Sequence, residues 1–273
     1  MKSELQRRVV TGGVGATLVL TLLIFGNWFV VLFLITGLSL GLVDEFSNMT
    51  LALRDQREKK YCLLAVTWLA ALFDVLVPQS EYVIVVFCFL AFFAYFLITA
   101  KRHQGADLTQ HFQELALSQF ALIYLILIPF YFRKIYDLQH GVEWILVFLL
   151  INWVGDTGAY FSGLRFGKKK LYPEISPKKT QEGAWGGLLS GAVVVLLFKF
   201  LFFQSLSVGV ALVLSVVVGA TAQMGDLCES FLKRSYHLKD SGSLLPGHGG
   251  LLDRFDGVVF SLPVMYAGIR IFT

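Results

Sequence analysis

The stretch YVIVVFCFLAFFAYFLITA, residues 82–100, contains no charged side chain and decides which kind of fold this chain can adopt. At about 1.5 Å of rise per residue, a helix of this length crosses the hydrocarbon core of a bilayer, which is about 30 Å thick. Backbone N–H and C=O groups in lipid must be satisfied within the protein, and a helix does this inside a single segment. Residues 82–100 are therefore predicted to form a transmembrane helix.

The composition extends this prediction to the whole chain. Apolar residues make up 56% of the sequence and charged residues 15%, with a mean hydropathy of +0.68. A soluble domain of this size would carry about a quarter of its residues as charged side chains. We therefore predict an all-α polytopic membrane protein with about nine transmembrane helices, at residues 9–27, 29–46, 61–78, 82–100, 112–132, 143–164, 184–203, 207–230 and 251–272.

The distribution of basic residues predicts the orientation of these spans. Nine spans place the two termini on opposite sides of the membrane. With the N-terminus in the cytoplasm, 19 Lys and Arg residues lie in cytoplasmic segments and 4 lie outside. Positive residues concentrate on the cytoplasmic side, so we expect a cytoplasmic N-terminus, an external C-terminus and a place in the cytoplasmic (inner) membrane.

Polar residues and glycines divide the chain into two halves. Residues 1–150 are mostly apolar runs and are expected to form a scaffold of about five spans, whereas residues 151–273 are expected to form a catalytic half of about four spans with cytoplasmic loops. In the sixth span, Asn152, Asp156 and Tyr160 recur every four residues and share one helix face. An ionisable residue inside a span indicates function, although Asp156 could also simply pair with a lysine at the membrane interface.

The loop after the sixth span contains two groups of lysines. Topology or anionic lipid headgroups are sufficient to explain the run 168–170. Lys178 and Lys179 instead lie between Pro177 and a predicted helix start, where Thr180 is placed to act as the N-cap. Lysines held in this way are candidate phosphate ligands.

The segment 225–256 has the highest density of chemically active side chains. Asp226, Glu229, Ser230 and Lys233 are spaced by three, four and seven residues, which places them on one helix face. Two further acids, Asp253 and Asp256, lie three residues apart in the first turn of the last span. Carboxylates that converge from two helices suit Mg²⁺, which binds a few carboxylates together with substrate phosphate oxygens.

Residues 230–256 resemble the signature of the phosphatidate cytidylyltransferase (CDP-diacylglycerol synthase) family. The resemblance is carried by Lys233-Arg234, Lys239-Asp240, Pro246, His248-Gly-Gly and Asp253-Arg-Phe-Asp256. The segments 156–163 and 176–183 resemble two further blocks of the same family. In the first 150 residues, Glu45 is the one family-like position.

The resemblance implies transfer of the cytidylyl group from CTP to phosphatidate, giving CDP-diacylglycerol and diphosphate, with Mg²⁺ and a possible second cation, monovalent or divalent. It implies that Asp226, Asp253 and Asp256 bind the metal and act in catalysis together with Lys239. The substrate-binding residues implied are Asn152, Asp156, Lys178, Lys179, Ser230, Lys233, Arg234, Asp240, His248 and Arg254. The expected partners are CTP, phosphatidate and membrane lipids and no nucleic acid, with a homodimer left open.

Three alternatives share part of this pattern. A CTP-dependent lipid or polyprenol kinase would use the same nucleotide in a membrane, but the signature at residues 230–256 argues against it. An ion-coupled transporter would carry its acids near the membrane midplane in two similar halves, and the chain shows no internal repeat. A CDP-alcohol phosphotransferase would need an acidic repeat of the Asp-Gly-x-x-Ala-Arg type, which this sequence lacks.

Overall fold

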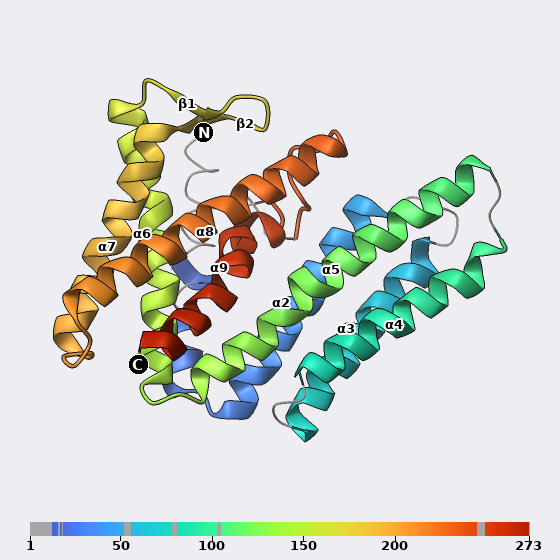
Figure 1. Cartoon of the computed structure of the whole chain (residues 1–273), viewed down its shortest axis with the longest axis horizontal. Coiled ribbons are helices and arrows are strands. Elements are labelled where there is room, and N and C mark those ends of the chain that lie inside the picture. Colours follow the sequence, from blue (N-terminus) through green and yellow to red (C-terminus); the bar gives the residue numbers. More distant parts are fainter. Residues whose placement is uncertain are drawn as a thin grey trace. The chain divides into compact units, whose positions relative to one another are not determined.

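The structure is a computed structural model that describes residues 13–15, 17, 19–51, 56–77, 81–102, 105–244 and 249–272. In these residues the chain is helical apart from one short hairpin and the connecting turns (Figure 1). Seven helices are long and apolar enough to cross a membrane: α2 (Trp28–Thr50), α4 (Glu81–Ala100), α5 (Ala106–Tyr136), α6 (Gly141–Phe166), α7 (Gln181–Leu201), α8 (Val208–Ser235) and α9 (Leu252–Phe272). The chain is thus a multi-pass helical membrane protein.

The two remaining predicted spans differ from these seven. The span expected at 61–78 is a helix, α3 (Gln56–Leu76), that begins five residues earlier. Its first turns include Arg57, Glu58, Lys59 and Lys60, so it has the length of a span but a more polar start. The span expected at 9–27 lies partly outside the described residues, and the described part shows a shorter apolar helix within Gly13–Phe25.

The chain forms two compact units. The first unit comprises Met1–Phe130 and Asp240–Leu252, and the second comprises Tyr131–Lys239 and Asp253–Thr273. Helices α5 and α9 contribute residues to both units. The expected boundary at residue 150 falls inside α6, and the assignment of scaffold and catalytic roles to the two halves stays a prediction.

The first unit contains a buried ion pair between two of its helices. Lys59 Nζ of α3 lies 2.6 Å from Glu114 Oε2 of α5, and both side chains are almost completely buried. The same ammonium group lies 5.3 Å from the centroid of the Phe96 ring of α4. Lys59 is one of the 19 residues counted above as cytoplasmic, as part of the loop before the span expected at 61–78. This loop assignment was wrong, because α3 begins at Gln56 and buries Lys59.

In the second unit, α6 and α7 pack closely through glycines. A Cβ at Gly183 would lie 2.8 Å from the carbonyl oxygen of Ala159 and 3.2 Å from Cα of Gly163. Only glycine permits this approach of two helix backbones. Figure 1 shows the two helices side by side, with the hairpin at one end.

The hairpin connects α6 to α7 and was not predicted from the sequence. Its strands are β1 (Lys170–Tyr172) and β2 (Ser176–Thr180), which pair antiparallel with Lys170 opposite Thr180. Thr180 Oγ1 accepts a hydrogen bond from the Gly183 N–H at 3.1 Å, which confirms the predicted N-cap of α7. The basic loop therefore has a defined conformation.

Candidate active site

Helix α8 presents its predicted polar face within the second unit. Ser230 Oγ lies 3.5 Å from Asp226 Oδ1, one turn before it, and Lys233 Nζ lies 2.5 Å from Glu229 Oε2. The Glu229 side chain is fully buried, and the Lys233 side chain is 12% exposed. The spacing of these residues in the sequence thus correctly predicted a shared helix face.

Lys233 also connects α8 to α9. Its Nζ lies 2.5 Å from Asp253 Oδ1, and the Asp253 side chain is 10% exposed. One ammonium group therefore bridges two carboxylates, Glu229 from its own helix and Asp253 from the first turn of α9. Two negative charges at low exposure need such a cation, since their repulsion is poorly screened away from water.

A second lysine reaches this region from the hairpin. Lys179 at the end of β2 forms an ion pair with Asp226 of α8, and both side chains remain about one-third exposed. Lys178 lies on the other face of the strand, where it is exposed. Of the two adjacent lysines, the structure brings Lys179 to the acids and leaves Lys178 exposed beside them.

Further carboxylates gather around Asp226. Asp256 is within electrostatic reach of Asp226, Glu229 and Asp156, and one of its oxygens, Oδ1, accepts the N–H of Gly257 at 2.6 Å. Asp156 on α6 interacts electrostatically with Asp226, and also with Lys179 and Arg254 of opposite charge. The backbones of α8 and α9 meet closely here, because a Cβ at Gly225 would lie 2.4 Å from the Asp256 carbonyl oxygen.

Two other predicted site residues have contacts within the protein. Asn152 is buried, donates from Nδ2 to the Phe148 carbonyl at 2.9 Å and accepts from Ser261 Oγ at 3.4 Å. Arg234 donates to the carbonyl oxygens of Ile175, in the turn of the hairpin, and Leu238. Asn152 therefore links α6 to α9, and Arg234 holds the hairpin against the end of α8. Their predicted contacts with substrate stay predictions.

The remaining predicted residues are on the surface or outside the described structure. Lys239 and Arg254 are exposed in the second unit, and Asp240 is exposed in the first. His248 lies outside the described residues. The roles assigned to these four residues stay predictions.

The donor chemistry of the site suits a divalent cation. The three predicted metal ligands, Asp226, Asp253 and Asp256, are all carboxylates, and Mg²⁺ prefers such oxygen ligands. Among the described residues, no three His, Cys, Asp or Glu side chains are grouped closely enough to hold a metal ion. Lysines pair instead with two of the three predicted ligands, Asp226 and Asp253.

Two glutamates of this region were not among the predicted site residues. Glu229 shares the face of Asp226, so its position was evident from the spacing, but its complete burial against Lys233 was not. Glu182 accepts the backbone N–H groups of Lys168 and Lys169 at 3.0 to 3.2 Å and so fixes the start of the hairpin. Its place in the first turn of α7 indicated a favourable helix dipole, but nothing in the sequence indicated this second contact.

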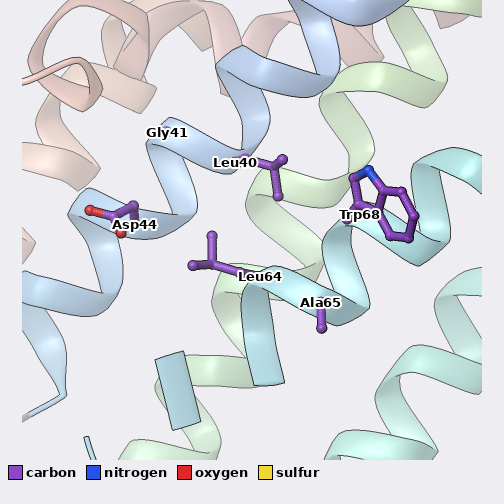
Figure 2. A pocket seen from close by; sticks show the side chains of 6 residues that line it. All are labelled: Leu40, Gly41, Asp44, Leu64, Ala65 and Trp68. Atoms are coloured by element: carbon purple, nitrogen blue, oxygen red, sulfur yellow. The ribbon is translucent and has the colours of Figure 1, made fainter. Parts of the chain in front are cut away.

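A pocket in the first unit has a different character. Figure 2 shows its lining from α2 and α3, with Asp44 and Trp68 at opposite ends of the view and Leu40 and Leu64 between them. The pocket has a volume of about 510 Å³, and its lining is almost entirely apolar. Asp44 is already paired with Lys60 at 2.5 Å. Such a lining suits hydrocarbon rather than phosphate, so the pocket is not assigned to the acid and lysine cluster.

Comparisons with known proteins concern the chain as a whole rather than single residues of this cluster. The profile of the Cytidylyltransferase family matches residues 6–272. The chain is 33% identical to the phosphatidate cytidylyltransferase of Bacillus subtilis strain 168 over 99% of both chains. It is 32% identical to the phosphatidate cytidylyltransferase of Thermotoga maritima, over 98% of this chain and 97% of that one. A protein of the same name from Staphylococcus epidermidis strain RP62A is 45% identical over 46% of this chain and 49% of its own.

Proposed function

The chain belongs to the cytidylyltransferase family, and on that premise we propose how its acid and lysine cluster transfers the cytidylyl group of CTP to phosphatidate. The products are CDP-diacylglycerol, a phospholipid precursor, and diphosphate. The observation that carries the proposal is the pairing of Lys233 with Asp253 and of Lys179 with Asp226. These pairs bring two ammonium groups and two carboxylates together from α8, α9 and the hairpin.

The reaction joins two anions, and this defines what the protein must supply. A phosphate oxygen of phosphatidate attacks the α-phosphorus of CTP, and the bond from that phosphorus to the leaving diphosphate breaks. The attacking phosphate is already ionised, so no side chain has to remove a proton from it. Catalysis therefore depends on alignment of the two groups and on positive charge at the phosphates.

Lys179 and Lys233 are the ammonium groups best placed to supply positive charge at the phosphates. Each is held by carboxylates and keeps part of its surface exposed, at 28% and 12% respectively. A lysine that is fixed before substrate arrives loses less conformational entropy when it bonds a phosphate oxygen. Arg254 and Lys239 are exposed cations that we assign to the departing diphosphate.

We assign Mg²⁺ to Asp226, Asp253 and Asp256, with a second monovalent or divalent cation as part of the same proposal. The support is the set of hard carboxylate oxygens and the mutual repulsion of Asp226, Asp256 and Asp156. When bound, the ion supplies positive charge that offsets the negative charge of the phosphates. With that charge on Asp226 and Asp253, Lys179 and Lys233 would stay beside the same acids and would have N–H donors left for substrate oxygens.

The membrane arrangement is part of the same proposal. We propose nine spans from the apolar runs of the sequence. From the distribution of Lys and Arg we propose a cytoplasmic N-terminus, an external C-terminus and a cluster that faces the cytoplasm. CTP is a cytoplasmic metabolite, and the acyl chains of phosphatidate remain in the bilayer, so this side is the one where both substrates meet. A homodimer in the cytoplasmic membrane stays a prediction.

Incubation of the purified protein with phosphatidate, Mg²⁺ and CTP labelled on one phosphorus tests this function. Label on the α-phosphorus should enter the lipid product, and label on the γ-phosphorus should be released in diphosphate. Transfer of γ-label to lipid would instead indicate a kinase. Absence of both labels from lipid, in a preparation that remains folded, would contradict the proposed function.

A further inference from the structure

Glu45 of α2 makes two contacts that have no part in the proposed transfer chemistry. Its Oε2 accepts a hydrogen bond from the backbone N–H of Leu252 at 2.9 Å and one from Ser241 Oγ at 3.2 Å. Glu45 is 5% exposed and Ser241 is 6% exposed. All three residues belong to the first unit. A buried carboxylate therefore holds both ends of the segment 241–252.

The contact with Leu252 matters because Leu252 is the first residue of α9. The first N–H groups of a helix lack partners inside the helix, and a preceding Ser, Thr, Asp or Asn commonly accepts one of them. The residue before α9 is Leu251, whose side chain has no acceptor. Glu45 supplies the missing acceptor from another helix, and its negative charge suits the positive end of the helix dipole.

Two glycines, Gly242 and Gly250, lie close to the Glu45 carboxylate. A Cβ at Gly242 would lie 2.6 Å from Glu45 Oε1. A Cβ at Gly250 would lie 2.6 Å from Glu45 Oε2 and 2.0 Å from Ser241 Oγ. A larger residue at Gly242 or Gly250 would therefore require either the Glu45 side chain or the backbone beside it to shift.

The two carboxylate oxygens are not equivalent. The Leu252 N–H and the Ser241 hydroxyl both donate to Oε2, whereas Oε1 is buried without a hydrogen-bond partner in the described residues. One acceptor oxygen is therefore sufficient for the contacts that are seen. A glutamine can present its amide oxygen to the same two donors, which makes it an informative replacement.

We propose that Glu45 is a positioning residue for cytidylyl transfer. Its carboxylate contacts Ser241 and Leu252, and the contact with Leu252 fixes the residue at which α9 begins. The next residue along that helix is Asp253, and Asp256 follows in the same turn, so the start of α9 decides where these two carboxylates lie along the helix. This inference rests on the proposed function for its effect on catalysis, but the contact itself can be tested separately.

Glu45→Ala, Glu45→Gln and Asp44→Ala, compared in the full-length protein, form the first part of the test. Because a displacement of about 1 Å can lower a rate by 10²-fold, Glu45→Ala should lower kcat by roughly 100-fold while KM for CTP changes little. Glu45→Gln should retain most of kcat, since it keeps the acceptor. Asp44→Ala is the matched control, because it removes the neighbouring acid of the Lys60 pair and should behave like the wild type.

Hydrogen–deuterium exchange of the Leu252 amide forms the second part. This amide should exchange faster in Glu45→Ala than in wild type, and should stay protected in Glu45→Gln and Asp44→Ala. If Glu45→Ala fails to accumulate, Gly242→Ala replaces it, because its methyl group crowds Oε1 and should produce the same two changes.

The two readouts separate the two proposals. If wild-type protein makes no CDP-diacylglycerol, the proposed function fails while the exchange measurement still decides the contact. Unchanged Leu252 protection in Glu45→Ala would overturn the contact. Faster exchange together with wild-type kcat would overturn the positioning role. A loss of kcat in Glu45→Gln as large as in Glu45→Ala, with Leu252 still protected, would also overturn it.

Discussion

Lys233 Nζ of α8 lies 2.5 Å from Asp253 Oδ1 in the first turn of α9, and the same nitrogen lies 2.5 Å from the buried Glu229. This contact joins two residues that are 20 positions apart in the sequence. It places a lysine, a group that can bind phosphate, against a carboxylate that is a predicted metal ligand. The central features of the proposed mechanism therefore meet at one side chain.

Lys233→Ala should reduce both stability and activity. Removal of the ammonium group leaves Glu229 buried without this cation, and loss of one partner of a buried pair costs about 3–5 kcal/mol of unfolding free energy. Lys233→Ala/Glu229→Gln should recover much of that stability, because the second change removes the stranded charge, yet it should not recover activity. Unfolding curves and initial rates of both variants check this. Recovery of activity together with stability would show that Lys233 acts through folding alone.

Lys179→Ala should affect activity with little effect on stability. Its partner Asp226 is 34% exposed, so water can solvate the carboxylate when the lysine is removed. A charge-assisted bond to phosphate is worth about 1.5–3 kcal/mol, so kcat/KM should fall roughly ten- to a hundredfold. Lys169→Ala is the control, since Lys169 is exposed and its backbone, not its side chain, bonds Glu182. Similar mild losses in both variants would remove Lys179 from the phosphate-binding residues.

The buried pair of Lys59 and Glu114 should contribute to stability rather than to chemistry. Glu114→Ala should lower the free energy of unfolding by about 3–5 kcal/mol, because it removes the buried carboxylate that is paired with the Lys59 charge. Lys59→Met/Glu114→Leu should restore most of it. Arg102→Ala breaks the exposed pair with Glu58 and should cost less than about 1 kcal/mol. Unfolding in mixed detergent micelles measures the stability of all three variants. Equal losses of stability in Glu114→Ala and Arg102→Ala would contradict the claim that burial makes the Lys59–Glu114 pair the more important one.

Topology reporters test the proposed orientation. A reporter fused after residue 273 should be active only if it functions outside the cytoplasm, whereas one inserted in the turn between β1 and β2 should be active only if it functions inside. The hairpin insertion supplies the matched position, because it lies in the segment with the most lysines. Both reporters on the same side would show that the number of spans between these positions is even rather than odd.

The features that the sequence predicted correctly depend on local spacing. Long apolar runs predicted the membrane helices, and the spacing of Asp226, Glu229 and Lys233 predicted one face of α8. Thr180 was correctly predicted as an N-cap from its place before a helix start. Each of these inferences needs information from only a few neighbouring residues.

The features that the sequence did not predict depend on contacts between distant segments. The pairing of Lys179 with Asp226 and of Glu45 with Leu252 requires helices to pack before the partners meet. The hairpin was missed because its strands are short and lysine-rich, without the alternation of apolar residues that indicates a strand. Lys59 was wrongly assigned to a loop because a charged residue near a helix start is typical of a loop. Its buried partner Glu114 is evident only from the structure.

The rate of CDP-diacylglycerol formation by Asp256→Asn, measured across a Mg²⁺ series at saturating CTP and phosphatidate, tests the central claim most directly. Asp137→Asn serves as the control, since Asp137 is an exposed acid of the second unit that pairs with Arg133. We predict that Asp256→Asn folds and inserts but loses at least about 100-fold in rate at every Mg²⁺ concentration, because a lost carboxylate ligand removes several kcal/mol of transition-state stabilisation. A rate within about threefold of the control, a difference of less than about 1 kcal/mol, would contradict the assignment of the reaction to these carboxylates.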